Sequence, residues 1–426
     1  MSLYVVANGA LRITSGALKT TPVSSLQVMN SEAPLELRRA ELLLKYYYKM
    51  KCHLQSPAFG CVINDNLYKF FNNRRIKSPA IVRIQHALQL YDIPIQPVLT
   101  FKTPIVCSHN LMLPQIDLDI VGISKNDTPH RVVRAIFRSL IDDKYDGHQL
   151  IFTDGSKSGE GVGSAAIMGV NKETVSLPRV STVFTAEVIA LRLAARLVRN
   201  SSADEKYLVC SDSLSALQEM KNVLTYDHLV HRVQLEFHEI ITSGYDVTLT
   251  WVPSHVGIQG NENVDAEARQ ASLRPPEFIP IPFRNWFPEI RRRAKELWTQ
   301  QWRTEGRDFY ELKPTLQKWA KTFKLSRREE VIINRLRLGH TRVTHGYLFD
   351  YEGGFIQQPM CRWCEVELLS IRHMLLECPV LQDVRENILK SALGEREVNI
   401  RNLIGEGGVI RNVIAYLREI GVYDEI

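Results

Sequence analysis

The sequence predicts an α/β domain in the middle of the chain, flanked on both sides by mostly helical regions. Three observations support this prediction: short apolar runs alternate with helical patterns over residues 148–273, an amphipathic pattern precedes them, and basic helical patterns follow. Apolar runs of about four to eight residues between turn residues indicate strands, and apolar residues at every third or fourth position indicate helices.

The central domain has the predicted order β-β-β-α-β-α-α-β-α within about 125 residues. We expect strands at residues 149–153, 162–170, 174–177, 207–210 and 247–252. We expect helices at residues 185–200, from residue 213, at 227–243 and at 260–272. Arg274 and the two prolines after it end the domain, because proline removes a backbone donor and clashes inside a helix.

The regions outside this domain differ in pattern. Residues 1–100 are expected to be helical, with the clearest pattern beginning at Pro34, since proline is tolerated at a helix start. Residues 101–147 contain several Pro and Asp breaks and predict a linker. Residues 283–350 predict a basic helical region, and residues 355–426 predict a cysteine/histidine motif with a helical tail.

The composition is that of a globular protein, with 45% apolar and 23% charged residues. No run of 18 apolar residues occurs and the first residues lack a signal-peptide layout, so we expect no membrane span. Of seven cysteines, three lie within 18 residues and four are scattered. This pattern does not predict a disulfide framework, and it favours an intracellular protein, cytoplasmic or nuclear, with one local metal site.

The net charge of +6 is concentrated in one region. Residues 283–342 contain 16 Lys/Arg against 7 Asp/Glu, a local charge of +9 that leaves about −3 for the rest. A basic region of this kind is typical of a nucleic-acid partner. A solvated helical surface is an equally good interpretation of the charge alone.

Four carboxylates are placed by the predicted elements so that they could meet at one edge of a sheet. Asp154 follows the first strand, Glu187 lies in the first turn of the first helix, Asp212 follows the fourth strand and Asp265 lies on the last helix. Like charges gathered there repel unless a cation neutralises them. Carboxylates suit hard Mg²⁺, and two such ions about 4 Å apart catalyse phosphodiester hydrolysis.

Each carboxylate alone has another interpretation. Asp154 with Gly155 and Ser156 is typical of a turn, Glu187 could complement a helix dipole, and Asp212 with Ser213 could cap a helix. Asp265 could be a surface charge. The four together, in this order and on these elements, favour the metal site.

His255 lies in a loop with one proline and two glycines between the last strand and the last helix. A lone loop histidine is usually a surface residue. Its position ten residues before Asp265 instead predicts a mobile proton carrier over the metal site, since imidazole titrates near neutral pH.

Four segments carry a family resemblance: TDGS at 153–156, TAEVIALRLA at 185–194, CSDSLSAL at 210–217 and WVPSHVGIQGNENVDAEAR at 251–269. They resemble the type 1 ribonuclease H family, and more closely the ribonuclease H domain of non-LTR retrotransposon polyproteins. The resemblance implies a ribonuclease H-like fold, a mixed five-stranded sheet with helices on both faces. It also implies an endonuclease that hydrolyses the RNA strand of RNA–DNA hybrids.

The same resemblance implies the roles of the site residues. Asp154, Glu187, Asp212 and Asp265 match the ligands of two Mg²⁺ ions, with Mn²⁺ as an alternative, and His255 matches the catalytic histidine. This chain lacks the asparagine that often precedes the glutamate, and it lacks a lysine/tryptophan-rich insertion between residues 212 and 246. We therefore expect the basic region, residues 283–342, to grip the hybrid.

RNA is distinguished from DNA by its 2′-hydroxyl and by the shape of the hybrid. From their positions beside the carboxylates, Gly155, Ser156 and Ser213 are expected to contact the nucleic acid. Phosphate and sugar contacts carry little base information, so we expect slight sequence preference.

A second metal site is predicted by the spacing Cys361-x2-Cys364-x8-His373-x4-Cys378. Three thiolates and one imidazole suit tetrahedral Zn²⁺ in a closed structural site, with the first pair on a turn and His373 to Cys378 on a short helix. The alternative is buried cysteines without a ligand. The cluster resembles the C-terminal CCHC motif of the same polyproteins, where nucleic-acid binding and a purely structural role are both open.

Residues 11–22 and 34–39 resemble the segment after the reverse transcriptase palm in those polyproteins. The paired aspartates of a polymerase palm do not occur in residues 1–147, so we expect no polymerase activity. We expect the chain to correspond to the C-terminal portion of such a polyprotein. A catalytically inactive nucleic-acid-binding relic is the main alternative. A transposase or integrase is disfavoured, because Glu187 falls between the first two aspartates instead of on a late helix.

Overall fold

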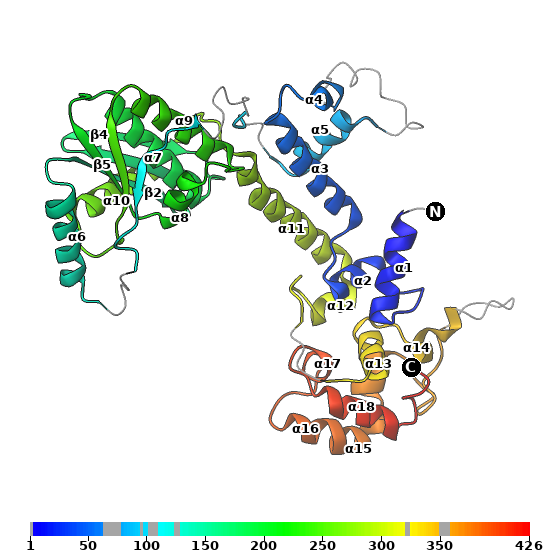
Figure 1. The fold of residues 1–426 in the computed structure, drawn as a ribbon. Coiled ribbons are helices and arrows are strands. Elements are labelled where there is room, and N and C mark those ends of the chain that lie inside the picture. Colours follow the sequence, from blue (N-terminus) through cyan, green and yellow to red (C-terminus); the bar gives the residue numbers. More distant parts are fainter. Residues whose placement is uncertain are drawn as a thin grey trace. The chain divides into compact units, whose positions relative to one another are not determined.

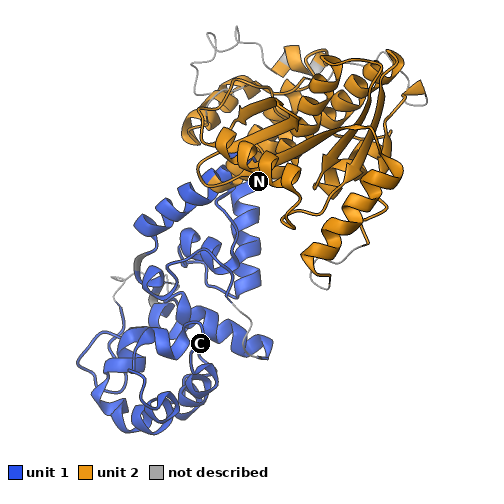
Figure 2. Cartoon of the chain, turned by 90° about the vertical axis from the view of Figure 1, so that its left-hand side faces the viewer, with its two compact units in different colours: residues 1–41, 293–426 blue, residues 42–292 orange. Residues whose placement is uncertain are grey.

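The computed structural model describes residues 3–62, 78–93, 97–100, 110–122, 128–319, 324–348 and 358–426. The chain divides into two compact units, coloured separately in Figure 2. We call Leu42–Arg292 the sheet unit, and Met1–Glu41 with Arg293–Ile426 the helical unit. Each has its own hydrophobic core. Within the described ranges, no helix combines the length and apolar character needed to cross a bilayer.

The sheet unit is built on a mixed six-stranded sheet with the strand order β1-β6-β5-β2-β3-β4. Strands β2, β4 and β5 are labelled in Figure 1. Its strands are β1 (Gln115–Asp117), β2 (Gln149–Lys157), β3 (Val162–Met168), β4 (Asn171–Leu177), β5 (Lys206–Ser211) and β6 (Asp246–Trp251). The pairs β2–β3 and β3–β4 are antiparallel, whereas β2–β5, β5–β6 and β1–β6 are parallel. The carboxyl ends of β5 and β6 therefore lie at the same edge of the sheet.

The helices of the sheet unit connect and cover these strands. They are α4 (Pro57–Val62), α5 (Ala80–Leu90), α6 (His130–Lys144), α7 (Val183–Arg199), α8 (Leu214–Lys221), α9 (His228–Thr242), α10 (Gln259–Ser272) and the short η3 (Phe283–Asn285). The unit boundaries fall within α3 (Leu35–Lys51) and α11 (Trp286–Glu305). Side-chain caps fix the starts of α7, α8 and α9. Thr182 accepts from the N–H of Thr185, Ser213 accepts from Ala216, and Asp227 accepts from Leu229.

Helices pack on both faces of the sheet. Successive side chains of a strand point to opposite faces. On β3, Ala166 belongs to the main core with residues of α7, and its neighbour Ala165 packs instead against Val264 and Ala268 of α10. The predicted order of elements over residues 148–273 is confirmed from β2 to α10, as are the mixed sheet and the two helical layers.

The predicted linker, residues 101–147, contains regular structure. Strand β1 pairs with β6 and adds a sixth strand to the expected five, and α6 buries Val133 and Phe137 in the main core. The Asp117 carboxylate accepts hydrogen bonds from Lys144 and Tyr145, both at 2.5 Å, and so ties β1 to the end of α6. A three-residue strand is too short to show alternation in sequence, and the Pro and Asp residues mark the ends of short elements. Residues 101–109 and 123–127 of the expected linker lie outside the described residues.

The sheet unit also continues beyond residue 273. The amide oxygen of Asn285 accepts from the N–H of Thr182 at 3.0 Å and from the Thr185 hydroxyl at 3.1 Å, at the start of α7. Trp286 is 1% exposed and stacks on Tyr48 of α3, with ring centroids 4.8 Å apart. Segments on both sides of the α/β domain are therefore part of its unit.

The helical unit consists of short helices around a second core. They are α1 (Leu3–Ser15), α2 (Val23–Asn30), α12 (Arg307–Leu312), α13 (Arg327–Arg337), α14 (Arg342–His345), η4 (Gly346–Leu348), η5 (His373–Glu377), η6 (Pro379–Leu381), α15 (Gln382–Arg385), η7 (Glu386–Lys390), α16 (Ser391–Leu393), α17 (Ile400–Ile404) and α18 (Ile410–Glu419). A capping box of Ser326 and Glu329 starts α13. The expected boundary between the basic helical region and the cysteine/histidine region, at residues 350–355, lies outside the described residues.

Candidate active site

The four predicted carboxylates lie on the expected elements, with two changes of position. Asp154 lies within β2, opposite Ala165 of β3, because this strand continues to Lys157 instead of ending before the aspartate. Helix α7 begins at Val183, so Glu187 lies in its second turn and not in its first. Asp212 directly follows β5, and Asp265 lies on α10, as predicted.

Gly155 allows α7 to approach β2 closely. A Cβ atom at this position would lie 2.5 Å from the backbone nitrogen of Glu187 and 2.6 Å from the carbonyl carbon of Ala186. Real Cβ atoms do not come this near to backbone, so a larger residue would push the helix away from the strand. The glycine next to Asp154 therefore keeps Glu187 beside it.

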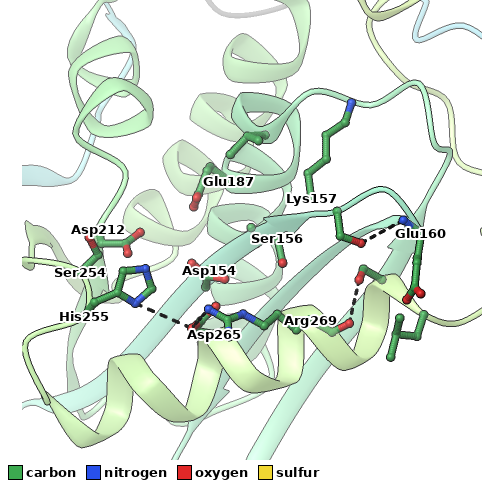
Figure 3. A pocket seen from close by; sticks show the side chains of 15 residues that line it. Asp154, Ser156, Lys157, Glu160, Glu187, Asp212, Ser254, His255, Asp265 and Arg269 are labelled. Carbon is green, nitrogen blue, oxygen red and sulfur yellow. Dashed lines mark hydrogen bonds and ion pairs between the residues drawn. The ribbon is translucent and has the colours of Figure 1, made fainter.

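The carboxylates converge on one pocket of about 550 Å³, shown from close by in Figure 3. Asp154, Glu187 and Asp212 each offer an oxygen within 4.8 Å of the others. Asp154 is 7% exposed and Glu187 is 6% exposed, so both carboxylates are largely removed from water. Asp265 lines the same pocket from α10.

Burial and mutual repulsion change the titration of this group. Burial, together with the charges of Asp212 and Asp265, raises the pKa of Asp154 to about 7. Burial, together with Asp154 and Asp212, raises the pKa of Glu187 well above its usual value. One oxygen of Glu187, Oε2, is buried and has no hydrogen-bond partner among the described residues. The described part of the chain therefore supplies no partner for this buried oxygen.

Two basic side chains face Asp265. Arg269, one turn further along α10, donates from Nη2 to Asp265 Oδ2 at 2.8 Å, and its charge opposes the rise in the pKa of Asp154. His255 Nδ1 lies 4.0 Å from the same oxygen, and its side chain is 66% exposed. His255 lines the pocket, and Figure 3 shows its imidazole between Asp212 and Asp265.

Of the three residues expected to contact nucleic acid, Gly155 and Ser156 line the pocket and Ser213 does not. Ser213 caps α8, since its hydroxyl accepts from the N–H of Ala216 at 3.4 Å. The pocket also includes Lys157 and Arg269, which the sequence reasoning did not select. Arg269 could have been found from its spacing, because residues four apart on a helix share a face.

The donor set fits divalent magnesium. Three carboxylates within 4.8 Å offer only oxygen ligands, the type that hard cations prefer. A cation would neutralise the charge that raises both pKa values and would give the buried Glu187 Oε2 a partner. The residues present therefore meet the chemical requirements of such an ion.

The basic region, residues 283–342, uses several of its arginines within the helical unit. Arg335 donates to the carbonyl of Gly16 at 2.8 Å, Arg337 to Ile404 at 2.7 Å and Arg328 to Asp424 at 2.9 Å. These guanidinium groups hold chain segments against α13. These three side chains therefore make contacts within the helical unit, which the charge count alone does not reveal.

The predicted zinc ligands come together in the helical unit. The three sulfur atoms of Cys361, Cys364 and Cys378 and one ring nitrogen of His373 all lie within 4.8 Å of one another. The Sγ atoms of Cys361 and Cys378 are 3.8 Å apart, and Cys364 Sγ lies 3.4 Å from His373 Nε2. No pair among these cysteines forms a disulfide.

The local structure around these ligands agrees with the expectation for Cys361 and Cys364 and departs from it at Cys378. Cys361 and Cys364 lie on a turn, where the N–H of Glu365 donates to the Cys361 carbonyl at 2.8 Å. His373 begins a π-helical turn that ends at Glu377, so Cys378 follows this turn instead of lying on it. Hydrogen bonds from the backbone N–H groups of Val366 and Glu367 lower the pKa of Cys364 to about 6, which favours the thiolate that binds metal.

A family model described as RNase H matches residues 146–273. Among solved structures, the chain is similar to RNase H1 from the halophilic archaeon Halobacterium salinarum NRC-1. The two are 23% identical, the match covers 29% of this chain and 97% of that chain, and the TM-score is 0.25. No curated protein matches the chain. Residues 146–273, which carry the carboxylate pocket, are a ribonuclease H domain.

Proposed function

We propose that the chain hydrolyses the RNA strand of RNA–DNA hybrids, with Asp154, Glu187, Asp212 and Asp265 as the ligands of Mg²⁺. The convergence of the first three carboxylates within 4.8 Å, two of them buried, carries this proposal. One Glu187 oxygen has no partner among the described residues.

Two divalent ions, when bound by such carboxylates, lower the pKa of an attacking water and stabilise a leaving oxygen. The chain supplies the fixed charges. Asp154 is held by the pairing of β2 with β3 and β5, and Glu187 is held by the close approach of α7 at Gly155. Ligands fixed by a sheet and a packed helix need little rearrangement when the substrate binds.

His255 is proposed to move a proton at the leaving group. Its imidazole lines the pocket and is exposed to solvent. It makes no hydrogen bond with any described residue, and its Nδ1 atom lies 4.0 Å from Asp265 Oδ2. An exposed imidazole can reach a leaving group and carry a proton to it. Arg269 is proposed to bind a substrate phosphate, because its guanidinium lines the pocket next to Asp265.

Selection of RNA is proposed to depend on contacts with the sugar and phosphate near Gly155 and Ser156, which line the pocket beside Asp154. Ser213 is left out of this set, because its hydroxyl caps α8. Contacts of this kind read shape and not sequence. We therefore expect cleavage of hybrids with unrelated sequences.

The cysteine/histidine cluster is proposed to hold one structural Zn²⁺. Its four ligand atoms are near one another, and Cys361, Cys378 and His373 are buried, which suits a closed site with no position for a substrate. With the ribonuclease H domain, this motif supports our proposal that the chain is derived from a retrotransposon polyprotein. Such a protein would act inside the cell.

The test is incubation of the full chain with a labelled RNA–DNA hybrid and Mg²⁺, beside an Asp212→Asn variant and a DNA duplex of the same sequence. We expect cleavage of the RNA strand by the wild type alone, lost when the divalent ion is withheld. A folded wild type that binds the hybrid without cutting it would overturn the enzyme proposal. That result would favour the inactive nucleic-acid-binding relic.

A further inference from the structure

The loop that carries His255 has a strained backbone. His255 has a φ of +56° and Gly257 a φ of +84°. A residue with a side chain adopts this region only when its surroundings hold it there. Val252 and Val256, on either side of the histidine, are buried in the main core at 0% and 1% exposure, and the imidazole projects outward.

Helix α6 lies outside the residues that match the ribonuclease H family, yet it packs on the core that holds this loop. Val133 is 1% exposed and belongs with Val256 to the main core cluster. The ring centroids of Phe137 and of Phe152, on β2, are 6.5 Å apart. At its other end, Lys144 bonds to the buried Asp117 of β1. The helix is therefore a fixed support and not a loose extension.

From this helix, Arg134 reaches the loop. Its Nη1 atom donates a hydrogen bond of 2.8 Å to the carbonyl oxygen of Val256, the residue after His255. A Cβ atom built on Gly257 would lie 2.8 Å from the same Nη1. The guanidinium thus lies directly against the Val256–Gly257 peptide. The N–H of the same peptide, that of Gly257, donates to the carboxylate of Glu262 at 3.1 Å.

We propose that Arg134 is a positioning residue that holds the His255 loop in its strained conformation and so places the imidazole over the carboxylate pocket. A hydrogen bond from a charged donor to a carbonyl is among the stronger ones, and it acts one residue from the histidine. This inference rests on the proposed function for its effect on turnover. Its effect on the loop itself is independent of catalysis.

The test compares Arg134→Ala with Arg138→Ala in the full chain. Arg138 lies one turn further along α6, is exposed, and makes no hydrogen bond or ion pair with any described residue, so its variant removes the same charge without touching the loop. For Arg134→Ala we expect kcat on a hybrid to fall about tenfold, with KM changed less than about twofold, because only the placement of His255 is lost. Arg134→Lys keeps one donor and should recover part of the rate.

A second measurement does not depend on activity. Amide hydrogen exchange of the peptide covering residues 252–262 should speed up in Arg134→Ala and remain at the wild-type rate in Arg138→Ala. Equal exchange and equal kcat in the two variants would overturn the inference, as would a rise in KM alone, which would make Arg134 a substrate contact. If the wild type cuts no hybrid but exchange rises only in Arg134→Ala, the proposed function fails and the positioning role stands.

Discussion

Asp154 on β2 and Glu187 on α7 offer carboxylate oxygens within 4.8 Å of each other, and both side chains are less than a tenth exposed. Burial is the largest cause of the raised pKa of each, and the other carboxylates add to it. Burial and repulsion therefore disfavour the charged forms of these carboxylates. The stability of the sheet unit should fall as the pH rises and they lose their protons.

The first prediction concerns the stability of the sheet unit without divalent ions. A carboxyl with a raised folded pKa binds its proton more tightly in the folded chain than in the unfolded chain. Its favourable contribution is complete below the unfolded pKa of about 4 and is lost as pH rises towards the folded value, about 7 for Asp154. We expect Asp154→Asn to raise the free energy of unfolding at pH 8 by about 1–3 kcal/mol.

Added Mg²⁺ should stabilise the wild type at pH 8 and have little effect at pH 5, and the Asp154→Asn variant should lose most of this response. Calorimetric unfolding of the full chain at the two pH values measures both effects. Asp142→Asn is the control, since this exposed carboxylate of α6 lies outside the pocket. A wild type with the same Mg²⁺ response at pH 5 and pH 8 would contradict the prediction.

The second prediction has the opposite sign and concerns Asp117. Burial raises the pKa of this carboxyl, but hydrogen bonds from Lys144, Tyr145 and the N–H of Asp119 outweigh burial and lower it overall. Its contribution to stability is present above the unfolded pKa of about 4 and is lost as pH falls through the lower folded value. We expect Asp117→Asn to lower the free energy of unfolding by about 1–3 kcal/mol at pH 7 and by much less at pH 3.

Urea unfolding of the full chain at these two pH values measures the difference. Asp119→Asn is the matched control, because its side chain is 68% exposed and also faces Lys144, at 3.1 Å. The Asp119→Asn variant should lower the free energy of unfolding by less than about 1 kcal/mol at pH 7. If the two variants are equally stable at pH 7, the Asp117 carboxylate does not tie β1 to α6.

The sequence alone predicts the α/β domain well because its strands and helices are long enough to show their periods. It also places Glu187, Asp212 and Asp265 on or directly after the correct elements. It does not predict that β2 continues past Asp154, because Gly155 and Ser156 are typical of a turn and only the pairing with β3 makes them a strand. Strand β1 and the contact from Arg134 to Val256 are also missed, since both depend on residues far apart in the chain.

The third prediction concerns the cysteine/histidine cluster, whose ligand atoms lie within 4.8 Å of one another in the helical unit. We expect the purified chain to contain about one equivalent of zinc, measured by atomic absorption. Cys378→Ser should lose this zinc, because Cys378 is fully buried beside Cys361 and no described residue nearby replaces its sulfur. The control variant Cys52→Ser should keep the zinc, because Cys52 is a buried cysteine of the sheet unit.

Loss of zinc should destabilise one unit and not the other. Cys361 and Cys378 belong to the core cluster of the helical unit, whereas the carboxylate pocket and its core lie wholly within the sheet unit. A zinc-selective chelator should therefore lower the unfolding temperature of the helical unit by several degrees and leave that of the sheet unit unchanged, because structural zinc stabilises the fold that binds it. Hybrid cleavage in Mg²⁺ should stay within about twofold of the untreated rate, as expected for a site that holds no reacting group. Cleavage that falls in parallel with zinc content would instead make the cluster part of substrate binding, and the structural role would be wrong.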